Sequence, residues 1–205
     1  MKKLAVVMVL AVVFCLPVVS VFAGERTNLE LIPKVGWLIK PEFTAKLNGK
    51  KDSYSKDSAF SAGADLFLDL KNNMFAGVGF MWGNNHKVSD NRYQNKNKYG
   101  FTNIYATFKY KFLVNNNEEN PLYLYPLAQL GVGLPSYKLD STPSNFKMTP
   151  GLYWGVGVGV EYYNVIFEAI YGCNYATMKW DDSRAVKGDY TATAFRLNVG
   201  YKFSL

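Results

Sequence analysis

Residues suited to metal binding and nucleophilic catalysis are scarce in this chain. Its 205 residues include one histidine, His86, and two cysteines, Cys15 and Cys173. A single imidazole excludes metal sites that need several histidines, and we expect no cofactor. Ser89 and Asp90 lie near His86, but neighbours in a polar segment lack the fixed geometry that a catalytic triad requires. The sequence therefore predicts a protein that is not an enzyme and has no catalytic, cofactor-binding or metal-binding residues.

Long apolar runs are also missing, except at the N-terminus. There Lys2 and Lys3 precede an apolar run over residues 4–19, which contains Pro17 and is followed by V-F-A at 21–23. This pattern is typical of a secretory signal peptide over residues 1–23, cleaved after the V-F-A site. The alternative is a membrane-anchoring helix, which Pro17 and the cleavage site disfavour.

Residues 24–205 are predicted to form one domain without a disulfide or a transmembrane helix. Cys173 is the only cysteine that remains after cleavage, so no intramolecular disulfide can form. The formal net charge of the whole chain is +7, but the Lys and Arg residues are scattered along the sequence. Nucleic-acid binding needs clustered basic residues, so we expect none. The acidic pair Asp181 and Asp182 is expected to be solvated rather than to bind a cation.

Aromatic residues are abundant, and they fall on alternating positions. They make up 16% of the chain, with 15 Tyr and 14 Phe. In the last segment, large apolar side chains share one face and polar or small ones the other, which predicts a β-strand with lipid on one side and a polar lumen on the other. The outward set is Phe195, Leu197, Val199, Tyr201 and Phe203; the inward set is Arg196, Asn198, Gly200 and Lys202.

Seven earlier segments alternate in the same way. Their outward rows carry large apolar residues and their inward rows carry glycines and charges, which is the reverse of a soluble barrel. Cys173 falls in an outward row and is expected to contact lipid. Pro126 cannot donate to a ladder and predicts a bulge or bend. The segments lie near 29–40 (with Lys34, Gly36 and Lys40 inward), 58–70, 74–82, 99–113, 122–137, 149–163 and 165–179.

Connection lengths alternate as well. The connections after the second, fourth and sixth segments are short, whereas those after the first, third, fifth and seventh are long and polar. Transmembrane barrels have short periplasmic turns and longer external loops. The predicted fold is therefore all-β: an eight-stranded antiparallel up-and-down transmembrane β-barrel over residues 24–205, preceded by the signal peptide.

Charged residues in the inward rows are predicted to line the lumen. Inward glycines leave room for them, because an eight-stranded barrel is barely wide enough for its own side chains. Two alternatives remain open: a sealed ionic plug, in which Glu161, Glu168 and Arg196 pair, and a narrow charge-lined conduit. The candidate lumen residues are Lys34, Asp65, Asp69, Lys109, Lys111, Glu161, Glu168 and Arg196.

The end of the chain resembles the C-terminal assembly signal of bacterial outer-membrane barrels. Gly200 is followed by the alternating aromatics Tyr201 and Phe203, although the chain continues through Ser204 and Leu205. Together with the eight strands and the loop pattern, this ending is similar to the small outer-membrane barrels of the OmpA, OmpX and OmpW kind. The resemblance implies export to the bacterial outer membrane and insertion by the barrel assembly machinery.

The resemblance also implies a range of roles. We expect contact with outer-membrane lipid and with lipopolysaccharide or its equivalent, and no nucleic acid. The first expectation is a structural or surface-interaction role, in which the external loops contact a host or surface ligand. The alternatives are a narrow porin for small solutes and, more distantly, a lipid-modifying outer-membrane enzyme.

Overall fold

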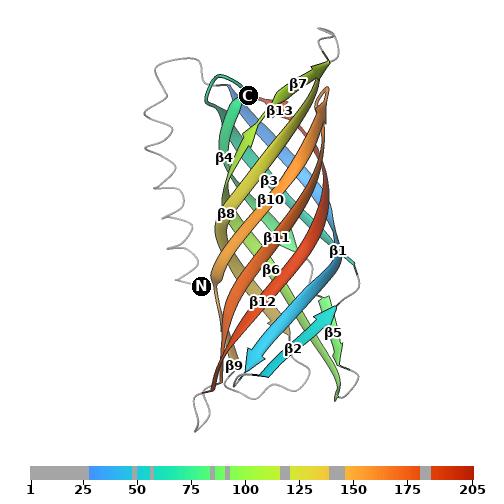
Figure 1. Ribbon diagram of the computed structural model, residues 1–205, viewed down its shortest axis with the longest axis vertical. Helices are drawn as coiled ribbons and strands as arrows, with labels where there is room; N and C mark the ends of the chain where they lie inside the picture. Colours follow the sequence, from blue (N-terminus) through green and yellow to red (C-terminus); the bar gives the residue numbers. More distant parts are fainter. Residues whose placement is uncertain are drawn as a thin grey trace.

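The computed structural model describes residues 28–47, 50–55, 58–83, 86–90, 93–115, 121–138, 146–180 and 186–205. Within these ranges the chain forms a single antiparallel sheet that closes into a barrel (Figure 1). The predicted signal peptide, residues 1–23, lies outside the described residues. No helix in the described part of the chain is long and apolar enough to cross a membrane.

Eight long strands make the wall of the barrel. Each pairs with the next in an antiparallel register, and the last pairs with the first, so the ring has no open edge. The predicted eight-stranded antiparallel barrel is therefore confirmed. The strands are β1 (Leu29–Leu47), β3 (Ala59–Asp69), β4 (Met74–Gly83), β6 (Tyr93–Tyr110), β8 (Leu122–Lys138), β10 (Gly151–Tyr162), β11 (Val165–Trp180) and β12 (Val186–Tyr201).

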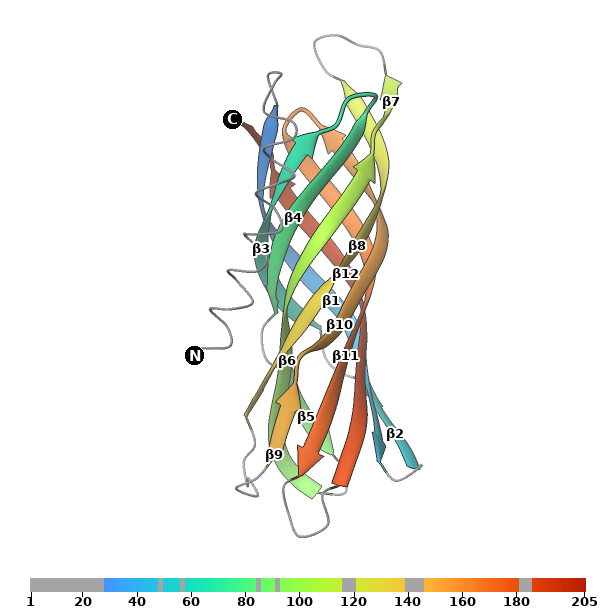
Figure 2. The same cartoon turned by 90° about the vertical axis from the view of Figure 1, so that its left-hand side faces the viewer.

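Five short strands extend the wall at its two ends. Three of them lie at the end with the long connections, which in transmembrane barrels is the external end; we call it the outer end. They are β2 (Lys50–Ser55), β5 (His86–Asp90) and β9 (Phe146–Thr149), paired with β1, β6 and β11. The others, β7 (Phe112–Asn115) and β13 (Phe203–Ser204), lie with the C-terminus at the opposite, inner end (Figures 1 and 2).

The two faces of the wall are the ones that the alternation predicts. Phe195, Leu197 and Val199 of β12 are exposed on the outside, whereas Arg196 and Asn198 between them are buried inside. Strand residues point alternately to the two faces of a sheet, so closure places every second residue in the lumen. The apolar exterior suits hydrocarbon, and the polar groups of the chain collect within the ring.

A bulge in β1 overturns one inward assignment. The pairing of β1 with β12 shifts between Ile39 and Glu42, and Lys40 has a left-handed φ of 40°. A bulge inserts an extra residue and interrupts the alternation. Lys40 is consequently exposed rather than inward, and Pro41 after it is buried. The strand then continues to Leu47 instead of ending near residue 40.

Of the bulge or bend predicted at Pro126, the bulge is not present. The register between β8 and β10 runs without a shift from Gly133 to Leu122, with Pro126 opposite Val158. The missing N–H of Pro126 is accommodated on the other edge of β8. There the ladder with β6 and β7 is interrupted between the pairs Lys109↔Leu127 and Phe112↔Leu124.

Lipid contact by Cys173 was also expected, and it is not observed. The residue lies in the outward row of β11, but only 2% of its surface is exposed. It pairs directly with Trp154 on one side and Thr193 on the other. The ring of Trp154 lies 6.0 Å from that of Tyr171, so aromatic neighbours on the outer wall cover the small thiol.

An arginine on the apolar exterior should destabilise the barrel according to its depth. Val158 is 54% exposed on the outer face of β10, and Tyr162 is 46% exposed on the same face at the inner end of that strand. We expect Val158→Arg to lower the free energy of unfolding in lipid vesicles by about 2–4 kcal/mol, and Tyr162→Arg by about 1 kcal/mol or less. Urea titration measures both values. Equal costs at the two positions would contradict the assignment of the apolar wall to lipid.

Candidate functional site

The structure places seven of the eight candidate charges inside the barrel. Lys34, Asp65, Lys109, Lys111, Glu161, Glu168 and Arg196 are all buried. Asp69 is different, because it ends β3, and its Oδ1 accepts a hydrogen bond of 2.8 Å from the backbone N–H of Lys71 in the turn that follows. That residue caps a tight turn and is not a lumen charge. The seven others separate into two ion-pair networks and one isolated arginine.

The inner network lies in the lumen at the end with the short turns. Lys111 Nζ lies 2.9 Å from Glu30 Oε1 and 2.8 Å from Glu161 Oε2. Lys109 Nζ lies 3.0 Å from Glu30 Oε2, and Lys202 bonds to Glu161 and lies 3.8 Å from Glu30. Three lysines and two glutamates thus share one buried cluster.

Aromatic rings support the lysines of this network. Lys109 Nζ lies 3.8 Å from the ring centroid of Phe67 and 5.0 Å from that of Phe75, and Lys111 Nζ lies 4.2 Å from the latter. A cation over an aromatic face is attracted by the ring quadrupole. The cluster has one more lysine than glutamate, and these contacts stabilise the positive charge that the glutamates do not neutralise.

The middle network lies one layer further into the barrel. Lys34 bonds to Asp65, and its Nζ lies 3.0 Å from Glu168 Oε2. The Tyr105 hydroxyl donates to Asp65 Oδ1 at 2.8 Å, and Asn198 Nδ2 donates to Glu168 Oε2 at 3.0 Å. Neutral donors therefore supply what a single lysine cannot give to two carboxylates.

Two inward glycines make this packing possible. A Cβ at Gly79 would lie 2.1 Å from Asp65 Oδ1, and one at Gly159 would lie 2.3 Å from Cζ of Tyr125. Any side chain at these positions would displace the groups it meets. The glycines thus allow the side chains of Asp65 and Tyr125 to lie close to the wall. The hydroxyl of Tyr125 donates to Glu168 Oε1 at 3.3 Å.

Arg196 stands apart from both networks. Its Nη2 donates to Gln129 Oε1 and to the Tyr153 hydroxyl, both at 3.3 Å, and that hydroxyl donates to Gln129 Oε1 at 2.7 Å. The predicted pairing of Arg196 with Glu161 and Glu168 is wrong. Those glutamates pair with lysines of the inner and middle networks, and the described residues include no ion pair that involves Arg196.

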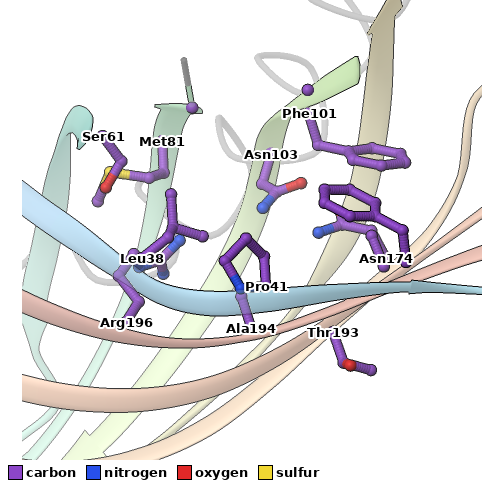
Figure 3. A pocket seen from close by; sticks show the side chains of 14 residues that line it. Leu38, Pro41, Ser61, Met81, Phe101, Asn103, Asn174, Thr193, Ala194 and Arg196 are labelled. Atoms are coloured by element: carbon purple, nitrogen blue, oxygen red, sulfur yellow. The ribbon is translucent and has the colours of Figure 1, made fainter. Parts of the chain in front are cut away.

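A cavity of about 40 Å³ adjoins Arg196 on its outer side. Ser61 and Met81 lie near the guanidinium in Figure 3, Asn103 lies in the middle of the view, and Asn174 lies beside Phe101. Six strands contribute to the lining. The polar residues in it come from β3, β6, β11 and β12.

An apolar cluster occupies the lumen beyond this cavity, toward the outer end. Tyr190 is at its centre: its ring centroid lies 5.8 Å from that of Phe43 and 6.1 Å from that of Phe101. Met178 and Ala176 complete the cluster together with Ala192. Phe43 and Phe101 also line the cavity, so the apolar cluster separates Arg196 from the outer end.

Several lumen residues escaped the sequence analysis. Glu30 lies near the start of its strand, ahead of Lys34, the first residue that the alternation assigns to the inward row. Tyr105, Tyr125 and Tyr153 were missed because an alternation of apolar and polar residues does not reveal a tyrosine that faces inward and donates its hydroxyl. Gln129 lies in the least regular segment, beside Pro126.

The described residues hold no group of three or more His, Cys, Asp or Glu that could bind a metal ion. The side chain of His86, and Asp181 and Asp182 as a whole, lie outside the described part of the chain. At the C-terminus, Gly200 pairs with Lys34, and the rings of Tyr201 and Phe203 lie 4.9 Å apart on the outer wall. Their role as an assembly signal stays a prediction.

A closed eight-stranded ring with an apolar exterior and a charged interior defines an integral β-barrel membrane protein. Residues 9–203 match the family described as the outer membrane protein beta-barrel domain. The chain belongs to this family, and its location is the bacterial outer membrane. No curated protein matches the sequence.

Solved structures share the fold at low sequence identity. Neisserial surface protein A is 17% identical, with a TM-score of 0.50 over 87% of this chain and 100% of that chain. Ail of Yersinia pestis is 16% identical, with a TM-score of 0.42 over 85% and 98%. OprG of Pseudomonas aeruginosa is 14% identical, with a TM-score of 0.42 over 87% and 96%.

Breaking the inner network should be costly. Glu161→Gln leaves three lysines with one glutamate, and we expect a loss of about 3–5 kcal/mol in the free energy of unfolding, because an unpaired buried charge remains. Asp69→Asn is the matched control, since it removes the same charge but keeps an acceptor for the turn; it should change stability by less than about 0.5 kcal/mol. Urea midpoints in lipid vesicles compare the two. Similar losses would contradict the buried network.

Proposed function

We propose that this protein is a sealed outer-membrane barrel that presents its outer end to surface partners and has no catalytic activity. The observation that carries the proposal is the inner network. Its members come from different parts of the wall. Glu30 lies in β1, Lys109 in β6 and Glu161 in β10, whereas Lys111 is the residue between β6 and β7 and Lys202 is the residue between β12 and β13.

Such a cluster obstructs the lumen across its width. An eight-stranded barrel is only wide enough for its side chains to fill, and these side chains are held by ion pairs to neighbours on other strands. An ion could pass only if buried pairs separated, which would leave charges without partners in a dry interior. The middle network adds a second barrier of the same kind.

The glycines give less support to the narrow porin than the sequence suggested. Inward glycines can widen a lumen, but Gly79 and Gly159 instead accommodate Asp65 and Tyr125. The residues that replace the missing side chains belong to, or bond to, the middle network. The space is therefore used to close the barrel rather than to open it.

The outer end favours contact with partners. The hairpin extensions built by β2, β5 and β9 continue the wall beyond the ring at that end (Figures 1 and 2). A rigid scaffold that positions connecting segments is the usual arrangement of binding loops. We propose that these segments contact a host or surface ligand, that the wall contacts lipid and lipopolysaccharide, and that the C-terminal strand engages the barrel assembly machinery.

Planar-bilayer recordings test the seal. Wild-type protein should give no steady conductance, because both networks obstruct the lumen. A fourfold variant, Lys34→Ala and Asp65→Ala with Lys111→Ala and Glu161→Ala, removes one ion pair and most of its side-chain volume from each network, and it should produce openings that the wild type lacks. Lys179→Ala, at an exposed position near the outer end, is the control and should remain silent. Steady, ion-selective wild-type currents would reject the seal and support the porin.

Attachment assays test the surface role. Cells that display the chain should adhere to plates coated with sulfated polysaccharide, neutral polysaccharide or serum glycoprotein better than cells without it. Replacing β2 and β5 with short Gly-Ser turns should remove this gain, because it trims the extensions of the outer end. The control replaces residues 71–73 at the inner end. Heat-modifiable gel migration shows that each variant folds, and attachment unchanged by trimming would contradict the role.

A further inference from the structure

Arg196 is a buried cation that makes no ion pair with any of the described residues. Only 5% of its surface is exposed, and its hydrogen bonds go to neutral oxygens of Gln129 and Tyr153. Its Nε has no hydrogen-bond partner among the described residues. A guanidinium carries donors on a planar fork that suits a carboxylate, and the Nε–H of this fork is left for a further acceptor.

Three polar residues that line the cavity beside Arg196 have unpaired atoms. Ser61, Asn103 and Asn174 belong to the lining, and Ser61 Oγ, Asn103 Oδ1 and Asn174 Oδ1 are buried without a hydrogen-bond partner in the described part of the chain. Asn103 is only 5% exposed and Ser61 is fully buried. Buried polar groups in folded proteins are nearly always hydrogen-bonded, so unpaired groups gathered around one cavity call for a ligand.

Charge balance alone does not explain this arrangement. The middle network holds two carboxylates and one lysine, so Arg196 in the next layer offsets the remaining negative charge. That role requires a cation near Asp65 and Glu168. It requires neither a cavity beside the guanidinium nor unpaired polar atoms on residues that line that cavity.

We propose that this cavity binds a small hydroxycarboxylate, of the size of glycolate or lactate. The carboxylate accepts from the Nε–H of Arg196, and the hydroxyl group donates to Asn103 or Ser61. A cavity of about 40 Å³ admits a solute of a few heavy atoms, because roughly 10–15 Å³ measured in this way holds one water molecule. Phe43 and Phe101 cover the outer side, and their movement admits the solute from the outer end.

Calorimetric titration of the folded protein in phosphatidylcholine nanodiscs tests the proposal. The three probes are glycolate, acetate, which lacks the hydroxyl group, and ethylene glycol, which lacks the carboxylate. Glycolate should bind, acetate should bind at least about tenfold more weakly, and ethylene glycol should give no heat of binding. Hydrogen bonds to a charged group contribute about 1.5–3 kcal/mol, so Arg196→Met should weaken glycolate binding roughly ten- to a hundredfold.

Two further variants test the binding site even if Arg196→Met does not fold. Asn103→Ala should weaken glycolate but leave acetate unchanged, and Lys179→Ala, which removes an exposed cation, should alter neither. Equal binding of acetate and glycolate, binding that survives Arg196→Met in protein that shows heat-modifiable migration, or no binding of any carboxylate to the wild type would each overturn the proposal. The last result would leave Arg196 as a counter-charge to the middle network. None of these outcomes depends on whether the barrel conducts.

Discussion

Every backbone N–H and C=O group that crosses the hydrocarbon layer must find a partner within the protein, and this requirement determines the rest of the structure. It is met by closing the sheet, since an open edge in lipid would leave unpaired groups at a cost of several kcal/mol each. The pairing of β12 with β1 completes the ring. Closure then directs half of all strand residues into a narrow interior, where polar side chains must satisfy one another.

The polar side chains of the interior are paired in separate layers rather than in a single network. Lysines outnumber acids at the inner end, where aromatic faces share the excess charge, and acids outnumber lysines in the middle, where tyrosine and asparagine donate the missing hydrogen bonds. The next layer has Arg196 with neutral partners, and the outermost is apolar. Polarity thus decreases toward the outer end, and the cavity beside Arg196 lies at the boundary between the polar and apolar layers.

The wall could be predicted from the sequence because alternation is a local property. Each of Lys34, Lys109, Glu161 and Arg196 faces inward for the same reason, namely its parity within a strand. Which charges pair depends instead on strand tilt and register, which bring residues far apart in sequence to one height. Arg196 therefore lies closer to the outer end than Glu161 and makes no contact with it. Parity also fails at the Lys40 bulge, where the regular pleat is interrupted, and at Asp69, the last residue of β3, whose carboxylate accepts from the turn that follows.

The inner network also joins the two ends of the chain. Glu30 lies near the start of the first strand and Lys202 follows the last long strand, and their charged groups lie 3.8 Å apart across the seam where the ring closes. Lys202 also bonds to Glu161 of β10. The inner network is complete only when the first and last strands have paired. A barrel in which β1 and β12 had separated would lose the pairing of these strands and expose glutamates with too few lysines at the same time, so closing the wall and completing the inner network are one event.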